Sequence, residues 1–274
     1  FRSLHKEFSK IQQKSTSPTT HKKIQEVETS IISTYENQES PSHLKKQMRK
    51  YKILGTSVVV IQDGEMLWEK CYGRSSKKKP LTINSNFTSP LLYKPLLAIT
   101  ALYYANKASI HLQDDLDKLF SQKKTKGQPK KDLDSFLKTE KQYDKFGILK
   151  IDKDYLKKNQ NQLIAFIEKL SEESILNTLQ KTIVEKFYLS NSLFEKENIF
   201  STTGSDLASI LIHIQNSKID KTNAIFPQDT IENIFSFAKN KTEDKNFFGI
   251  SCVDKNFSCL AIMHVEKGYG AVIL

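Results

Sequence analysis

Lys94 is the residue whose position most directly suggests chemistry. It begins an apolar run, "KPLLAITALYYANK", and follows the segment "FTSPLLY" at Phe87–Tyr93. A charged side chain among apolar ones costs free energy unless it is paired or has a function. Because Pro95 is tolerated in a first helical turn, the run predicts a long apolar helix that begins at Lys94. The simpler interpretation, an exposed lysine in a first turn, stays open at this point.

Few other residues have the spacing of a chemical site. The six histidines are dispersed and include no H-x-x-x-H pair, which would place two metal ligands on one helical face. The acidic segment Asp114–Asp117 lacks the alternating spacing of a calcium loop. The nine glycines occur singly, so the sequence has no glycine-rich phosphate loop. We therefore predict no metal and no cofactor.

The clearest structural signal is a β-hairpin at Ser57–Tyr72. Two β-branched or apolar runs flank Asp63-Gly64, a pair that favours the positive φ angles of a tight hairpin turn. The chain ends in a second region that alternates like strands, at Asn246–Leu274. Helices are predicted between these regions, after the one at Lys94, over 160–170, 174–187 and 201–215. This order predicts one α+β domain with an antiparallel sheet formed from both chain ends, flanking helices and a helical region.

The beginning of the chain differs in composition from the rest. Residues 1–40 are predicted to form a basic extension with one amphipathic helix, in which Ile24 and Val27 begin a helical spacing that continues to about Tyr35. Residues 41–274 are predicted to form the domain. Within it, residues 121–147 are rich in lysine and poor in apolar residues, and we predict a loop there.

The overall composition excludes some classes of protein. A content of 38% hydrophobic and 27% charged residues is ordinary for a globular chain, and no apolar run is long enough to span a bilayer. The net charge of +11 favours an acidic partner such as RNA, anionic lipid or an acidic protein face. A general habit of lysine use explains the same charge equally well. Three scattered cysteines indicate neither a disulfide framework nor a zinc site and fit a reducing compartment.

The order of the predicted elements resembles the serine β-lactamase-like family, which includes penicillin-binding proteins and related serine esterases and peptidases. The similarity covers most of the chain. The similar segments begin with the opening hairpin at 53–73 and the nucleophile helix with the acidic segment after it at 87–120. They continue with a helix pair at 162–191, a helix start at 201–211 and the last strands at 248–274. The resemblance implies a β-lactamase/transpeptidase-like fold.

The resemblance also implies where catalytic residues should lie. The family uses S-x-x-K at a helix start, where the lysine activates the serine three residues before it. Aligned on Lys94, the serine position falls on Leu91, which has no lone pair and cannot form an acyl-enzyme. Other S-x-x-K matches occur in this lysine-rich chain, but none of them precedes a strongly apolar helix.

The family's two other motifs are also altered. The motif of Tyr or Ser that ends in Asn falls on Tyr155-Leu156-Lys157, which keeps the tyrosine and replaces the asparagine by Lys157. The K-T-G or H-T-G strand motif falls on Ile250-Ser251-Cys252, where Ile250 replaces the basic residue, Ser251 keeps a hydroxyl, and cysteine displaces the glycine. The resemblance thus implies a site that has lost its nucleophile, with Lys94 as a remnant.

Three functions are compatible with these residues. The first is a catalytically inactive, structural or accessory subunit of a larger assembly, in contact with other protein subunits. The second is a serine hydrolase of esters or peptides that uses a displaced nucleophile, Ser89 or Ser251, with Lys94 or Tyr155 as the base. The third is a binding protein that kept the cleft as a ligand pocket. Leu91 and Cys252 should narrow that cleft, so this third function is the least favoured.

Two features at the chain ends add expectations. The first 23 residues are basic and contain a single acidic residue, Glu7, which is typical of a mitochondrial transit region. We therefore expect a mitochondrial complex, either a respiratory-chain assembly or a ribosome with an RNA contact. Relatives continue after the last strand into a helix that covers the sheet. A chain that stops at Leu274 is therefore expected to expose an apolar patch for a partner.

Overall fold

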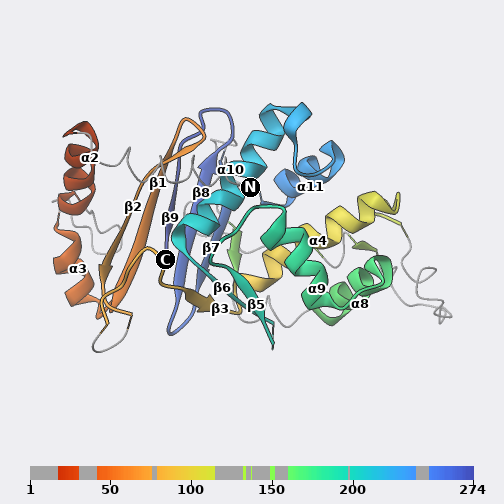
Figure 1. Cartoon of the computed structure of the whole chain (residues 1–274), viewed down its shortest axis with the longest axis horizontal. Helices are drawn as coiled ribbons and strands as arrows, with labels where there is room; N and C mark the ends of the chain where they lie inside the picture. Colours follow the sequence, from red (N-terminus) through yellow and green to blue (C-terminus); the bar gives the residue numbers. More distant parts are fainter. Residues whose placement is uncertain are drawn as a thin grey trace.

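Strands from both ends of the chain meet in one six-stranded sheet (Figure 1). The computed structural model describes residues 18–30, 42–75, 79–114, 132, 133, 137, 149–151, 160–196, 198–238 and 247–274. The strand order is β2-β1-β9-β8-β7-β4, and all neighbours are antiparallel except β4 and β7. The strands are β1 (Gly55–Gln62), β2 (Glu65–Gly73), β4 (Leu149–Ile151), β7 (Phe247–Val253), β8 (Ser258–His264) and β9 (Gly270–Ile273). The predicted antiparallel sheet is thus confirmed, with one parallel strand added at its edge.

The hairpin of β1 and β2 forms as its turn residues predict. Asp63 and Gly64 have φ angles of 54° and 71°, the two positive values that a type I′ turn requires. Side chains of β1 alternate between two hydrophobic clusters, because successive residues of a strand point to opposite faces. Val59 belongs to the main cluster and Val58 to a smaller one on the other face.

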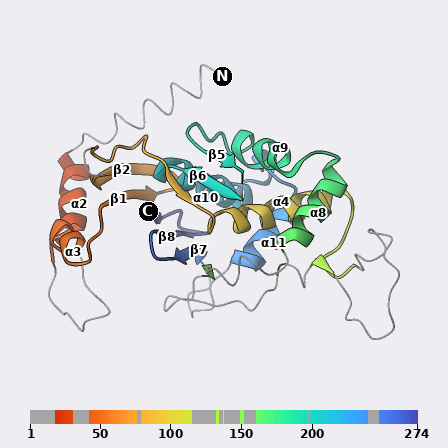
Figure 2. The ribbon, with the colours of Figure 1, turned by 90° about the horizontal axis from the view of Figure 1, so that it is seen from below.

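Helices cover both faces of the sheet (Figures 1 and 2). Helix α10 (Gly204–Ile219) packs on β1, β2, β8 and β9. On the other face, α2 (Pro18–Thr29) and α3 (Leu44–Lys50) cover the hairpin through the smaller cluster. A helical region beside the sheet contains α4 (Tyr93–Lys107), α8 (Gln160–Ser171), α9 (Ile175–Leu179), the π-helix η1 (Gln180–Glu185) and α11 (Gln228–Ala238). The 3-10 turn η2 (Lys221–Asn223) joins α10 to α11.

A second, small sheet positions the entry to α4. Its strands, in the order β3-β6-β5, are β3 (Phe87–Ser89), β6 (Ile199–Thr202) and β5 (Leu193–Glu195). Strand β3 leads into α4, and β6 leads into α10. The two helices that carry the family-like segments therefore begin from neighbouring strands.

Some elements differ from the sequence-based expectations. Helix α2 begins at Pro18, before the predicted apolar spacing, while residues 31–41 lie outside the described part. Helix α3 and the strands of the small sheet were not predicted, because they are short. Helix α11 was missed although its apolar residues recur at helical spacing. Most of the predicted loop at 121–147 also lies outside the described residues. None of the helices in the described part of the chain combines the length and apolar character needed to cross a membrane.

Two of the cysteines are closer than their sequence positions suggested. Cys252 in β7 and Cys259 in β8 are direct cross-strand partners, and both are buried free thiols. A hydrogen bond with Cys252 raises the pKa of the Cys259 thiol, and burial raises it further. The description of these cysteines as scattered is therefore wrong for this pair, because strand pairing joins residues that are distant along the chain.

Candidate functional site

Leu91 lies in the turn that joins β3 to α4. Its side chain is fully buried, with 0% of its surface exposed, and belongs to the main hydrophobic cluster. Lys94 follows in the first turn of α4 and is 1% exposed. The structure therefore places a hydrocarbon side chain three residues before a buried lysine, at the start of a helix whose next turns are apolar.

Ser89 is oriented toward its own loop. Its Oγ accepts a hydrogen bond from the backbone N–H of Leu91 at 3.1 Å, and the residue is fully buried. The hydroxyl thus satisfies a backbone donor at the entry to α4, where four N–H groups lack helical partners. This contact explains the serine as a structural residue of the turn.

Tyr93 is a residue of this region that sequence reasoning missed. Its ring is fully buried against Phe194, and its hydroxyl has no hydrogen-bond partner among the described residues. Burial raises the pKa of the Tyr93 phenol, and the negative charge of Glu168 raises it further. Nothing in the sequence singled out Tyr93 as a buried tyrosine with an unpartnered hydroxyl, since a tyrosine beside an apolar helix is ordinary.

Removing the Tyr93 hydroxyl should not destabilise the protein. An unpaired buried hydroxyl costs about 1–3 kcal/mol, so we expect Tyr93→Phe to raise the free energy of unfolding by up to about 1 kcal/mol. Urea unfolding of the variant and the wild type measures the difference. A loss of more than about 1 kcal/mol would instead mean that the hydroxyl has a partner, such as an ordered water.

Strand β7 carries the residues that align with the third motif. Ile250 pairs with Ala261 of β8 and packs on the main cluster. Ser251 pairs with Leu260, which pairs in turn with Ile273 of β9, and Ile273 pairs with Val58 of β1. Val58 belongs to the smaller hydrophobic cluster, on the face of the sheet that α2 and α3 cover. Because neighbouring residues of a strand point to opposite faces, Ser251 faces away from the main cluster that contains Leu91.

The outer edge of β7 is covered by β4. Their parallel register pairs Leu149, Lys150 and Ile151 with Ile250, Ser251 and Cys252. The backbone groups along this edge of β7 therefore take part in a ladder with the chain itself. An oxyanion needs backbone N–H donors that are free to point at it. In this structure, the motif segment of β7 is engaged in strand pairing on both sides.

Tyr155 and Lys157, the residues aligned with the second motif, lie outside the described residues, as does Leu156. Their predicted role stays a prediction. The structure therefore places Leu91, Lys94, Ile250 and Ser251, and it brings Leu91 and Ile250 into one hydrophobic cluster.

The segment "STTGSDL" forms a network of hydrogen bonds at the beginning of α10. Thr203 caps the helix by accepting a hydrogen bond from the N–H of Asp206. The buried Asp206 carboxylate accepts hydrogen bonds from the N–H groups of Ser190 and Asn191 and from the Ser192 hydroxyl. This carboxylate fixes the loop after η1 to the beginning of α10.

A second carboxylate lies between β2 and the same helix start. Glu69 of β2 accepts a hydrogen bond from Ser57 at 3.2 Å. The absence of a side chain at Gly204 leaves space for the Glu69 carboxylate, since a Cβ on residue 204 would lie 3.0 Å from Glu69 Oε1. Burial raises the pKa of Glu69, although hydrogen bonds from Ser205 and Ser57 oppose that shift. The proximity of Asp206 raises it slightly more.

The shifted pKa of Glu69 predicts a pH dependence of stability. Because the folded-state pKa lies above the ordinary carboxyl value of 4.5, the folded protein binds the proton more tightly than the unfolded chain. The corresponding stability is present below about pH 4.5 and is lost as the pH rises through the folded-state pKa. Urea midpoints from pH 4 to 8 should therefore fall less in Glu69→Gln than in the wild type. Parallel profiles would contradict this assignment.

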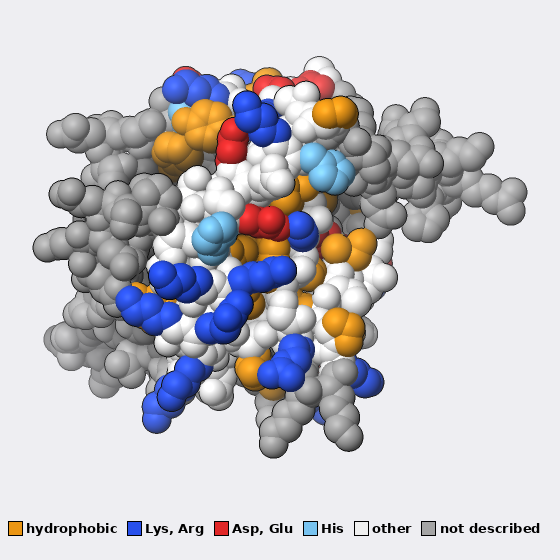
Figure 3. Space-filling model, turned by 90° about the vertical axis from the view of Figure 1, so that its left-hand side faces the viewer, with side chains coloured by type: hydrophobic (Ala, Val, Ile, Leu, Met, Phe, Trp, Pro, Cys, Tyr) orange, Lys and Arg blue, Asp and Glu red, His pale blue; other side chains and the backbone are white. Residues whose placement is uncertain are grey.

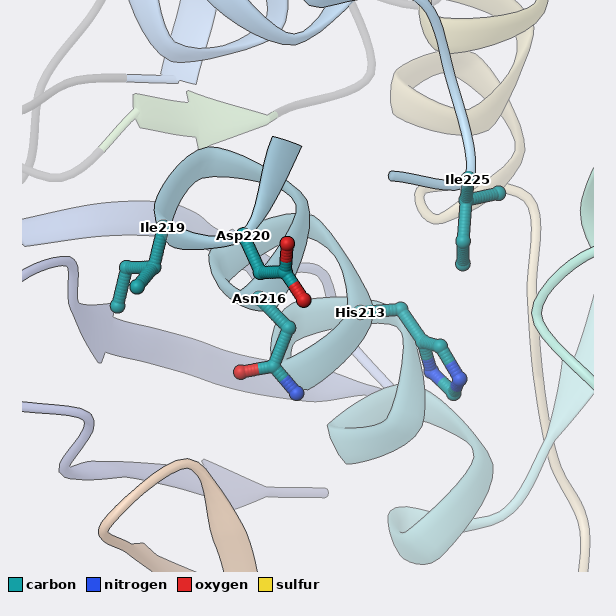
Figure 4. A pocket seen from close by; sticks show the side chains of 5 residues that line it. All are labelled: His213, Asn216, Ile219, Asp220 and Ile225. Carbon is teal, nitrogen blue, oxygen red and sulfur yellow. The ribbon is translucent and has the colours of Figure 1, made fainter. Parts of the chain in front are cut away.

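A cavity of about 440 Å³ lies at the other end of α10, lined by His213, Asn216, Ile219, Asp220 and Ile225 (Figure 4). The His213 Nδ1–H donates to the Ser209 carbonyl at 2.8 Å, and burial lowers the pKa of His213. Asp220 accepts hydrogen bonds from the N–H and hydroxyl of Thr222. Asp220 thereby caps η2, and His213 bonds one turn back within α10. Within the described residues, no three His, Cys, Asp or Glu side chains form a group that could hold a metal.

Comparison with known proteins identifies the fold. No protein-family model and no curated protein sequence matches this chain. Among solved structures, the octameric penicillin-binding protein homologue from Pyrococcus abyssi matches with a TM-score of 0.65 and 16% identity, over 84% of this chain and 71% of that one. SurE with D-Leu matches with a TM-score of 0.64 and 13% identity, over 84% and 68%. D-alanine carboxypeptidase AmpC from Burkholderia cenocepacia matches with a TM-score of 0.58 and 12% identity, over 84% and 90%.

Proposed function

We propose that this chain, which has the fold of serine β-lactamases and penicillin-binding proteins, is catalytically inactive and serves as a structural or accessory subunit of a larger assembly. The observation that carries the proposal is Leu91. A fully buried leucine lies three residues before Lys94, at the position that the S-x-x-K alignment assigns to the attacking serine. Acyl transfer in this fold requires a nucleophile at that point, and a hydrocarbon cannot supply one.

Two further observations support the loss of activity. Ser89 holds the turn before α4 through its hydrogen bond to Leu91, and Ser251 faces the opposite side of the sheet from Leu91. Ser89 lies five residues before Lys94 and so lacks the three-residue spacing of an S-x-x-K pair, and Ser251 lies on strand β7. The pairing of β4 with β7 in addition engages the edge that would offer an oxyanion donor.

The location that we propose is mitochondrial. The support is compositional, namely the basic, acid-poor segment of residues 1–23 and a net charge of +11. A respiratory-chain complex and a mitochondrial ribosome are both compatible with a basic subunit that keeps an enzyme fold for its shape.

The native size of the protein tests this proposal. Antibody detection after cell fractionation and gradient sedimentation should find the protein in the mitochondrial fraction, in a particle much larger than its own 31.5 kDa. The wild type and a Ser89→Ala/Ser251→Ala variant should show equal, background hydrolysis of activated esters. Sedimentation as a free monomer would contradict the subunit role, and turnover lost in the variant would favour the hydrolase alternative.

A further inference from the structure

The turn at the end of α3 carries cations and exposed apolar side chains together. We call it the α3 surface and define it by eight exposed residues: Lys45, Lys46, Arg49, Lys50, Tyr51, Lys52, Ile53 and Leu54. Figure 3 looks onto this end of the molecule and shows Lys and Arg side chains gathered over its lower half, with hydrophobic side chains among them. The surface takes no part in the site around Leu91.

The cations of the α3 surface form one outward helical face. Lys45 and Arg49 are four residues apart, as are Lys46 and Lys50, so each pair lies on the same side of the helix. The opposite side of α3 is buried through Gln47 and Met48. No acidic residue occurs from position 43 to 62. Glu28 of neighbouring α2 forms an ion pair with Lys70, and the charge of Lys45 also lowers the pKa of Glu28. The α3 surface is therefore strongly positive.

Backbone hydrogen bonds fix the segment that carries the apolar side chains of this surface. The N–H of Ile53 donates to the carbonyl of Met48 at 2.8 Å, and the carbonyl of Leu54 accepts from the N–H of Arg74 at 2.8 Å. Leu54 is nevertheless 63% exposed, Tyr51 49% and Ile53 47%. The fold thus fixes three large apolar side chains in water directly beside the cations.

We propose that the α3 surface docks the protein on an anionic membrane. Lipid phosphate and carboxylate groups match the cations, and Ile53 and Leu54 match the apolar boundary of the acyl chains. A nucleic acid would use the cations and could stack on Tyr51, but it offers nothing to two aliphatic side chains. The aliphatic pair therefore favours lipid. This inference is independent of whether the protein is catalytically inactive.

Vesicle sedimentation tests the proposal with the full chain. At 0.1 M salt, the wild type should bind vesicles of 70% phosphatidylcholine and 30% phosphatidylserine at least tenfold more strongly than vesicles of phosphatidylcholine alone. Since each cation near an anionic surface contributes about fivefold, Lys45→Gln/Arg49→Gln/Lys50→Gln should lose at least tenfold in binding. Ile53→Ser/Leu54→Ser should lose about fivefold or more, because it removes the inserted apolar groups.

A charge-matched control keeps the test specific. Lys107→Gln/Lys169→Gln/Lys221→Gln removes one exposed cation each from α4, α8 and η2, and it should change binding less than twofold. Helices α4 and α8 lie at the opposite end of the molecule from α3 (Figure 1). Equal losses in this control, or no loss in the apolar variant, would overturn membrane docking through the α3 surface. So would an absence of vesicle binding, or tight binding to a 20-nucleotide RNA that the cation variant alone abolishes. All substituted residues are exposed, so unchanged thermal melting verifies that the variants fold.

Discussion

Leu91→Ser is expected to destabilise the protein by about 4 kcal/mol and to leave it without acyl-enzyme chemistry. Truncating a buried leucine costs about 2–5 kcal/mol, and a hydroxyl without a partner in an apolar cluster costs about 1 kcal/mol more. Leu91 is fully buried in the main cluster, so both terms apply in full. Placing a serine at this position therefore weakens the fold, because the surrounding residues pack against a hydrocarbon.

Urea unfolding separates the two terms of this prediction. Leu91→Ala isolates the lost packing and should cost about 3 kcal/mol, while the difference between the alanine and serine variants reports the buried hydroxyl. Leu91→Met conserves volume and should cost less than about 1.5 kcal/mol. A serine variant that is destabilised by less than 1 kcal/mol, or that reacts with a serine-directed probe, would mean that position 91 opens into a polar cleft.

Asp206→Ala is expected to cost about 3 kcal/mol through the loss of one buried acceptor. The carboxylate accepts from the N–H groups of Ser190 and Asn191, at 3.2 and 2.8 Å, and from the Ser192 hydroxyl at 2.7 Å. Its removal leaves donors without partners beside a buried helix start, each costing about 1–3 kcal/mol if water cannot replace the bond. The helix also loses a negative charge near its N-terminus, where the backbone dipole favours one.

Asp206→Asn is the matched control for that prediction. The amide keeps the volume and one acceptor oxygen but places an NH2 group against a donor, so an intermediate loss of about 1–2 kcal/mol is expected. The urea midpoint should be highest for the wild type, lower for Asp206→Asn and lowest for Asp206→Ala. Equal urea midpoints for Asp206→Ala and the wild type would show that the hydrogen-bond network at the beginning of α10 does not stabilise the fold.

Local signals predicted much of the fold. The Asp63-Gly64 turn and the apolar helix after Lys94 each depend on neighbouring residues, and each forms as expected. The antiparallel sheet from both chain ends followed from the order of such elements. Segments whose sequence lacks a strong period, such as α3 and the short strands of the small sheet, could not be predicted in this way.

The candidate site could be predicted only in part. Alignment of the S-x-x-K motif on Lys94 pointed to Leu91, and the structure reveals how completely that leucine is buried. The covering of β7 by β4 was not predictable, because a three-residue strand has no period and its pairing is non-local. The opposite orientation of Ser251 follows from strand alternation once its register is known, and the sequence alone does not fix that register.

Covalent labelling of the full chain tests the central claim most directly. Intact-protein mass spectrometry after exposure to a fluorophosphonate, with an active serine hydrolase as the positive control, reports whether any serine is an activated nucleophile. The account predicts an unmodified mass for the wild type, under conditions that label the control completely. A stoichiometric adduct on one serine, abolished by Ser89→Ala or Ser251→Ala, would contradict it.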